Sequence, residues 1–259
     1  MSKTYFIAGG LGLIGWQLVK KIINENEKVI ILDKKDDPSE KQCEFIKANA
    51  IPVLNCNARD TLKIKEFINH YHNHEGEITG LVNLLAFYEE REKQMQPIET
   101  YLDEVWEAAI NVNINDTYRL TKVFLEYFLQ NKIKASFVFT SSIYGILGPD
   151  NRIYEGGEYL GAAMRTPAHY AFAKAGVLGF SRLIATEYGN KNIRSNCVTP
   201  GGVFSGQNEA FIKKYSDRVP LQRMANAEEV ADSIQFLMSD KSSYITGQNL
   251  VIDGGLSAW

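Results

Sequence analysis

The amino-acid sequence predicts an α/β fold: a doubly wound parallel sheet of about seven strands, with helices on both faces, in a single domain spanning residues 1–259. Short apolar runs rich in Val, Ile and Leu alternate with helical patterns along the whole chain, and this alternation is typical of βαβ units. The runs are apolar at odd and even positions alike, as in strands covered on both faces. A chain of 259 residues can bury a large core, and sheets of this kind commonly form one domain.

The expected strands are the apolar runs at 4–9, 28–33, 51–56, 80–86, 135–142, 193–200 and 248–253. Helical periodicity predicts helices at 13–25, 60–73, 101–130, 168–189, 207–215 and 227–239. Residues 143–167 are rich in Gly, Pro and polar residues and show no clean period. They predict a long loop, and loops of that length are usually functional or disordered.

Composition points to a small-molecule partner. The net charge is −3, the isoelectric point is near 5.9, and the basic residues form no stripe, so neither nucleic acid nor an anionic membrane is expected as a partner.

Cys43, Cys56 and Cys197 show no CxxC spacing and favour a reducing, cytoplasmic location. The apolar stretch 4–19 has four glycines and is too short to span a bilayer. The histidines of "HYHNH", 70–74, lack an acidic or cysteine partner, so no metal is expected.

A glycine-rich turn connects the first predicted strand and helix. Gly9, Gly12 and Gly15 lie in "IAGGLGLIG", where glycines allow close approach to a pyrophosphate and the helix N-terminus favours its charge. Asp33 ends the next strand, 18 residues after Gly15, where a carboxylate accepts hydrogen bonds from a ribose and repels a 2′-phosphate. A Rossmann-type sheet with NAD is therefore expected, and NADP is the less favoured alternative.

Tyr170 and Lys174 lie four residues apart in "HYAFAKAGVLGF" and so project side by side from one helix face. An ammonium near a phenol lowers the phenol's pKa from about 10, which suits proton transfer near neutral pH. Taken alone, the pair also fits an amphipathic helix with one lysine extending to solvent.

The surrounding motifs decide between these readings. The YxxxK pair downstream of "FTSS", the glycine turn, and "VPLQRMANAEEVADSIQFLMSDKSSYITGQNLVIDGG" resemble the short-chain dehydrogenase/reductase family over nearly the whole chain. The resemblance implies that Tyr170 is the general acid/base and that Lys174 lowers its pKa and binds the nicotinamide ribose. Ser142 is similar to the serine that binds the substrate oxygen, and Asn113 to the asparagine that anchors a water of the proton relay. Each of the last two also fits a local role, as a strand-end cap and a helix kink.

The same resemblance implies a set of cofactor-binding residues. Asn57 stands where the family usually has an aspartate at the adenine, Val203 resembles the residue at the carboxamide, and Ser205 replaces a threonine. The full set is Gly9, Gly12, Leu13, Ile14, Gly15, Asp33, Asn57, Ala58, Ala86, Tyr170, Lys174, Pro200, Val203 and Ser205.

The chain departs from the family pattern in two motifs outside its active-site helix. "NLLA", 83–86, replaces Asn-Asn-Ala-Gly, whose second asparagine normally braces the sheet. The glycine spacing GxxGxxG resembles the extended branch of the family, which has a larger substrate domain. Because the chain ends soon after "VIDGG", the single-domain branch is expected.

An insertion next to the active site is the most informative departure. Ser142 and Tyr170 are 28 residues apart, about twice the usual spacing, which predicts an active-site insertion at about 143–167. Its "PDxRIYEG" pattern is similar to a subgroup found among flagellin-modification and surface-polysaccharide enzymes. A sugar, sugar phosphate or nucleotide sugar is the expected substrate. Candidate substrate-binding residues, besides Ser142, are Arg152 and Arg165 as a phosphate clamp, Tyr154 as a stacking platform and His169 in the pocket wall; a solvated loop surface is the alternative for the arginines.

The expected activity is NAD(H)-dependent interconversion of a secondary alcohol and a ketone, on a sugar-type substrate of surface-glycan or flagellin-glycan biosynthesis. An NAD-retaining sugar dehydratase or epimerase is one alternative, and an NAD(H)-binding sensor or scaffold without turnover is another. Family resemblance also implies a homodimer or homotetramer joined through 101–130 and 168–189. Apolar residues available for that contact are Val123, Phe124, Phe172, Val177 and Phe180.

Overall fold

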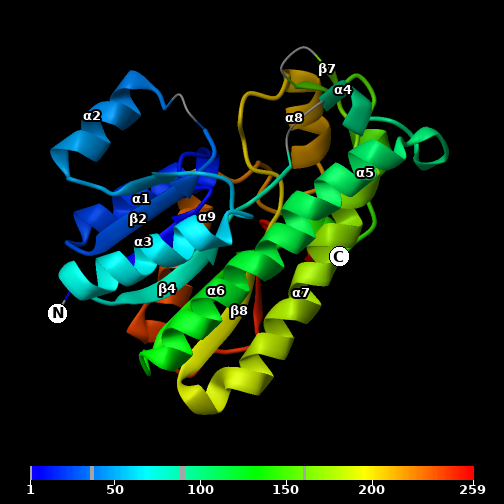
Figure 1. The fold of residues 1–259 in the computed structure, drawn as a ribbon. Helices are drawn as coiled ribbons and strands as arrows, with labels where there is room; N and C mark the ends of the chain where they lie inside the picture. The colour runs from blue at the N-terminus through cyan, green and yellow to red at the C-terminus, as the bar shows by residue number, and fades with distance from the viewer. Residues whose placement is uncertain (1, 36–37, 88–90, 160–161) are drawn as a thin grey trace.

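Seven parallel strands form the central sheet in the order β3-β2-β1-β4-β5-β8-β9, as the sequence predicts (Figure 1). The computed structural model describes residues 2–35, 38–87, 91–159 and 162–259. The strands are β1 (Thr4–Ala8), β2 (Lys28–Asp33), β3 (Val53–Asn55), β4 (Ile78–Asn83), β5 (Ala135–Thr140), β8 (Ile193–Pro200) and β9 (Asn249–Ile252). The order reverses between β1 and β4, and ligands of open α/β sheets bind at the carboxyl ends of strands beside such a reversal.

Helices cover both faces because the strand side chains alternate in direction. Phe6, Leu81 and Phe137 pack against α3 (Thr61–His74), α6 (Thr117–Gln130) and α7 (Ala168–Tyr188). On the other face, the apolar side chains of the sheet pack against the remaining long helices, α1 (Leu13–Asn24) and α9 (Ala227–Met238). Two cores therefore hold the sheet between helical layers (Figure 1).

A helix absent from the sequence prediction, α2 (Glu40–Ala48), follows β2. Its N-terminus is a capping box, in which the Ser39 hydroxyl accepts from the Gln42 amide and the Gln42 side chain accepts from the Ser39 amide. Gln42 Nε2 also donates to the Leu11 carbonyl at 3.2 Å, which ties this helix to the glycine turn.

The single helix expected at 101–130 is interrupted. It consists of α5 (Asp103–Ile110), a π-helical segment (Asn111–Asp116) and α6. The Thr117 hydroxyl donates to the Asn113 carbonyl at 2.8 Å and accepts from Asn83 Nδ2 at 3.0 Å. Asn83, the one asparagine left in "NLLA", therefore braces the end of β4 against the start of α6.

The predicted long loop at 143–167 contains secondary structure. It includes 3₁₀ turns at Ile143–Gly145 and Asn151–Tyr154 and a short antiparallel pair, β6 (Glu158–Tyr159) and β7 (Ala162–Ala163); Leu160 and Gly161 lie outside the described residues. A small separate core joins this insertion to α8 (Glu209–Ser216) and the chain after it. The other short elements are α4 (Arg91–Gln94) and 3₁₀ turns at Ile98–Thr100, Gly189–Lys191, Asp240–Ser242 and Leu256–Ala258.

Three of the five residues predicted for a subunit contact are not exposed. Val123, Phe124 and Val177 are buried in the core, and Phe180 packs against that core, so they stabilise the monomer. Phe172 is 60% exposed and contacts the Trp106 ring from α5, with ring centroids 5.6 Å apart. Among the helices that the structure describes, none is both long enough and apolar enough to cross a membrane.

Candidate active site

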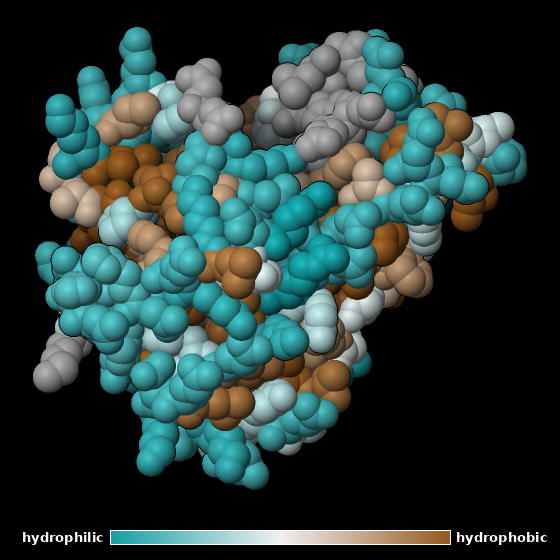
Figure 2. All heavy atoms as spheres, in the orientation of Figure 1, coloured by the Kyte–Doolittle hydropathy of each residue, from teal (hydrophilic) through white to brown (hydrophobic). Residues whose placement is uncertain are grey.

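A cavity of about 1070 Å³ opens at the carboxyl ends of the strands. The surface is hollowed at this edge (Figure 2), and the ribbon has α2 and α8 on opposite sides of the same edge (Figure 1). All fourteen residues predicted to bind a cofactor line the cavity, together with Ser142, Tyr154 and Arg165. Of the other predicted site residues, Asn113, Arg152 and His169 do not line it.

The glycine turn forms the floor of one end of this cavity. Gly9 has a φ of +82°, which side chains disfavour, and a Cβ on Gly15 would lie 2.2 Å from the Gly9 carbonyl oxygen. Asp33 stabilises the turn because its carboxylate accepts from the Leu11 amide at 2.9 Å and the Lys35 amide at 3.1 Å. The result is an unobstructed backbone cradle at the N-terminus of α1, which fits a dinucleotide pyrophosphate.

A polar network that the sequence analysis missed lies beside the predicted adenosine end. The Asn57 side-chain oxygen accepts from the Arg59 backbone amide and from Arg59 Nε at 3.2 and 3.1 Å. Arg59 Nη2 reaches the buried carboxylate of Asp116 at 3.2 Å, and Arg119 contacts its other oxygen at 2.8 Å. Asn57 and Arg59 both line the cavity, and the buried carboxylate orients the arginine there.

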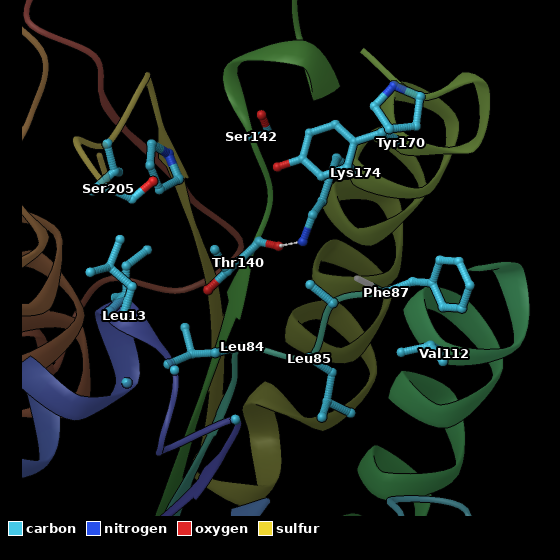
Figure 3. A pocket seen from close by; sticks show the side chains of 18 of the residues that line it. Leu13, Leu84, Leu85, Phe87, Val112, Thr140, Ser142, Tyr170, Lys174 and Ser205 are labelled. Atoms are coloured by element: carbon cyan, nitrogen blue, oxygen red, sulfur yellow. Dashed lines mark hydrogen bonds between the residues drawn. The ribbon is translucent and has the colours of Figure 1, made fainter. Parts of the chain in front are cut away.

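Tyr170 and Lys174 extend from α7 toward the end of β5 (Figure 3). Lys174 Nζ donates to the Thr140 carbonyl at 2.9 Å and lies 5.7 Å from the centre of the Tyr170 ring. Burial lowers the pKa of Lys174 to about 8. The Ser141 hydroxyl donates to the Lys174 carbonyl at 2.7 Å. These contacts fix the two side chains at the cavity wall next to Ser142.

In the protein on its own the pKa of Tyr170 is raised, which differs from the expected lowering. Burial raises the pKa of Tyr170, a hydrogen bond with Ser142 opposes that rise, and Tyr154 adds to it electrostatically. The Lys174 ammonium donates to the Thr140 carbonyl. Tyr170 is therefore a protonated donor at neutral pH.

Asn113 lies behind the cavity, in the π-helical segment. Its side-chain oxygen accepts from the Phe87 amide at 3.3 Å, which connects this segment to the chain after β4. Its Nδ2 is buried and has no hydrogen-bond partner among the residues that the structure describes. A buried amide donor of this kind suits a bound water.

Two predicted substrate-binding residues are not in the cavity. Arg152 pairs with Asp150 through Nε and Nη2, at 2.8 and 2.9 Å, and its side chain is 85% exposed. His169 is 1% exposed, and its Nδ1 lies 2.8 Å from the Tyr101 hydroxyl. Burial, and secondarily Lys174, lowers the pKa of His169 to about 4. Arg152 thus forms a local surface pair within the insertion, and His169 is a neutral residue of the interior.

The insertion supplies a wall that the sequence analysis found only in part. Tyr154 was predicted, but its ring stacks on Phe211, with centroids 5.6 Å apart, and its hydroxyl binds those of Tyr144 and Thr166. The one available sequence signal was that Tyr144 follows Ser142 by two residues. The cavity-lining residues of this part that were not predicted are Phe87, Met95, Tyr144, Met164, Thr166, Gln207, Phe211, Tyr215 and Met224.

Comparison with protein families supports the same chemistry. Residues 3–155 match the short chain dehydrogenase family, and residues 158–257 match the family described as enoyl-(acyl carrier protein) reductase. The chain belongs to the short-chain dehydrogenase/reductase family. It is accordingly an oxidoreductase.

Three relatives show how widely this family varies. The chain is 32% identical to the 3-oxoacyl-[acyl-carrier-protein] reductase FabG of Thermotoga maritima, over 98% of both chains. It is 27% identical to post-translational flagellin modification protein A of Campylobacter coli, again over 98% of both. A short chain dehydrogenase from Leptospira borgpetersenii, solved with bound NAD+, is 31% identical with a TM-score of 0.86, over 99% of this chain and 93% of that one. The two curated relatives carry different functional names, although each is similar to this chain over nearly its whole length.

Proposed function

We propose that this short-chain dehydrogenase interconverts a secondary alcohol and a ketone with NAD(H), on a sugar, sugar phosphate or nucleotide sugar. The observation that carries the proposal is the position of Tyr170, Ser142 and Lys174 on one wall of a cavity whose other end is the glycine cradle. A bound nicotinamide supplies or accepts the hydride. All other steps belong to side chains of this chain.

Tyr170 exchanges a proton with the substrate oxygen, and Ser142 donates a second hydrogen bond to that oxygen. Tyr170 and Ser142 line the same cavity, so both hydroxyls can reach one substrate oxygen. Preoriented donors of this kind stabilise the charge that develops on an alkoxide. Lys174 binds the cofactor ribose. The Nδ2 of Asn113, which has no partner within the described part of the chain, holds a water that returns protons from solvent.

NAD is the proposed cofactor, in preference to NADP. Asp33 lines the cavity at the end of β2, where its negative charge would repel a 2′-phosphate. The similar short chain dehydrogenase from Leptospira borgpetersenii binds NAD+, which is consistent with this preference.

A polar, sugar-derived substrate is proposed on two grounds. The chain resembles flagellin modification protein A over nearly its full length. In addition, the exposed Arg165 lines the cavity and forms no hydrogen bond or ion pair with the residues that the structure describes, so it is available for an anionic group. Surface-glycan or flagellin-glycan biosynthesis in the cytoplasm is the proposed setting.

A substrate screen tests the proposed function. The purified protein is assayed for NADH oxidation and NAD+ reduction with phosphorylated and nucleotide-linked sugars and their keto forms, with a 3-oxoacyl thioester and a steroid ketone as comparison substrates. One NADH consumed per alcohol formed supports the proposal. Sugar conversion by protein that retains NAD without net NADH would replace it with a dehydratase or epimerase. NADH binding without turnover on the whole panel would replace it with a binding protein.

We also propose a homodimer or homotetramer that buries the exposed part of α5 and α7. Phe172 at 60% exposure, with Trp106 against it, is the residue of the predicted set still available for this contact. Light scattering during gel filtration measures the mass directly. Replacing Phe172 with Lys lowers that mass if the proposal is right.

A further inference from the structure

Three hydroxyl groups of the insertion form an ordered chain along the substrate wall. The Thr166 hydroxyl donates to the Tyr154 oxygen at 2.9 Å, and the Tyr154 hydroxyl donates to the Tyr144 oxygen at 2.7 Å. All three residues line the cavity. Each hydroxyl donates a hydrogen bond to the next, so this series of hydrogen bonds ends at the Tyr144 oxygen.

Tyr144 ends this chain with a proton to donate. Its oxygen accepts from Tyr154, and its own O–H donates to none of the residues that the structure describes. Burial raises the pKa of Tyr144 above its ordinary value, so the hydroxyl stays protonated. A donor on a cavity wall is satisfied by a ligand or water that accepts from it, and a ligand oxygen there gains a hydrogen bond.

The position of Tyr144 relates this donor to the reacting atoms. Tyr144 lies two residues after Ser142, in the same 3₁₀ turn, and its amide donates to Ser142 Oγ at 3.3 Å. Tyr144 and Tyr154 line the same cavity as Ser142 and Tyr170. The donor therefore belongs to the same wall as the pair that would bind the reacting oxygen.

Packing keeps the chain of hydroxyls in place. The Tyr154 ring stacks on Phe211 of α8 at an angle of 26°. Asp150 bonds Arg152 and also pairs with Arg218 at 3.0 Å, while Lys214 Nζ donates to the Glu155 carbonyl at 2.8 Å. The residues of the "PDxRIYEG" pattern thus attach the insertion to α8 and leave Tyr154 to orient Tyr144.

We propose that Tyr144 is a specificity-determining residue that donates a hydrogen bond to a second substrate oxygen, next to the carbon that is oxidised or reduced, with Tyr154 and Thr166 as positioning residues. The ligand class is a vicinal diol or α-hydroxyketone, as found in sugars, and not an isolated ketone. This inference rests on the proposed function and narrows its substrate class.

Binding of two small probes to the NADH complex tests the inference. The probes are trans-cyclohexane-1,2-diol and cyclohexanol, which differ by one hydroxyl, and their dissociation constants are measured by NMR titration. In Tyr144→Phe, affinity for the diol falls about 3- to 10-fold, as expected for one neutral hydrogen bond, and affinity for cyclohexanol changes less than about twofold. Equal changes for both probes, an unchanged diol affinity, or a wild-type protein that does not bind the diol would overturn the inference.

Further variants separate recognition from folding. Tyr244→Phe removes a fully exposed hydroxyl and serves as the matched control. Tyr154→Phe and Thr166→Val retain the Tyr144 hydroxyl but remove a group that orients it. They should therefore lower the affinity for the diol less than Tyr144→Phe does. Thr166→Ser keeps the hydroxyl at position 166 and should restore the wild-type affinity. If these variants lose affinity for both probes equally and also have lower thermal stability, the three hydroxyl groups have only a structural role, and the inference is overturned.

Turnover distinguishes this inference from the proposed function. NADH oxidation is measured with 2-hydroxycyclohexanone and cyclohexanone. If the wild type prefers the hydroxyketone and Tyr144→Phe loses that preference, both the proposed function and the recognition role of Tyr144 are supported. If neither ketone nor any sugar is reduced while diol binding still depends on Tyr144, the proposed function fails and the recognition role stands. If both ketones are reduced equally well by wild type and variant, the recognition role fails.

Discussion

Gly15 and Gly9 pack so closely that a Cβ on Gly15 would lie 2.2 Å from the Gly9 carbonyl oxygen. This contact joins the first turn of α1 to the end of β1 and shapes the floor of the cofactor end of the cavity. No rotation of a flexible side chain can relieve it, because both partners are backbone. No residue with a Cβ fits at position 15 unless the backbone moves, so the packing requires glycine there.

Gly15→Ala is expected to weaken NADH binding at least about tenfold and to destabilise the fold by about 1 to 3 kcal/mol, since the backbone of the turn must shift. Fluorescence titration with NADH and urea unfolding measure the two effects. Gly179→Ala is the matched control, because a Cβ there meets nothing within 4 Å. That helical substitution should stabilise by about 0.5 to 1 kcal/mol. Normal NADH binding by Gly15→Ala would show that the cradle is not the cofactor site.

Asp33→Asn tests the cofactor preference. The amide retains an oxygen that can accept from Leu11 or Lys35, but it lacks the charge that would repel a 2′-phosphate. The ratio of kcat/KM for NADH over NADPH should fall about tenfold or more, mainly through better use of NADPH. Asp60→Asn, at the N-cap of α3 and outside the cavity, should leave the ratio unchanged. Equal use of both cofactors by the wild type would contradict the NAD assignment.

The sequence predicts the sheet and the cofactor end of the cavity because both depend on local patterns. The apolar runs specify the strands, and glycine spacing before a helix specifies the turn. The capping box at Ser39 was an available signal for α2 that apolar periodicity did not reveal, since few of its residues are buried. The π-helical segment has no such signal: it depends on contacts of Asn113 with Phe87 and of Thr117 with Asn83, which are distant in sequence.

The substrate wall was predicted less well because its residues come from an insertion without periodicity. Sequence alone could not tell that Arg152 pairs with Asp150 on the surface while Arg165 faces the cavity. It also could not show that His169, next to Tyr170, turns into the interior toward Tyr101. Such choices depend on which neighbours the fold brings together.

His169→Gln tests the burial of that imidazole. Because the pKa is about 4 in the folded protein and 6.5 for an ordinary histidine, the unfolded chain binds more protons between these values, and stability falls as the pH is lowered through this window. Between pH 7 and pH 5 the wild type should lose about 1 to 2 kcal/mol more than the variant, measured by urea unfolding. His74→Gln, which removes an exposed imidazole, should match the wild type. Parallel losses in wild type and His169→Gln would refute the assignment.

Tyr170→Phe removes the proposed proton donor and retains the ring. We expect kcat to fall about 10²- to 10⁴-fold, the range for loss of a general acid/base, with NADH affinity within about twofold of wild type. Tyr118→Phe, on the exposed face of α6, is the control. A variant that retains full activity would transfer the proton-transfer role to another group.

Arg165 and Arg152 provide a matched pair for the anionic part of the substrate. Both lie in the insertion, but only Arg165 lines the cavity, whereas Arg152 is neutralised by Asp150. Arg165→Ala should raise KM for a phosphorylated sugar about tenfold, because a charge-assisted hydrogen bond contributes roughly 1.5 kcal/mol, with little change in kcat. Arg152→Ala should leave KM unchanged, since its guanidinium is occupied at the surface. Steady-state kinetics with the phosphorylated sugar and its unphosphorylated form measure both effects. A KM increase in Arg152→Ala alone, or an equal increase for the uncharged sugar in Arg165→Ala, would show that Arg165 does not recognise the anion.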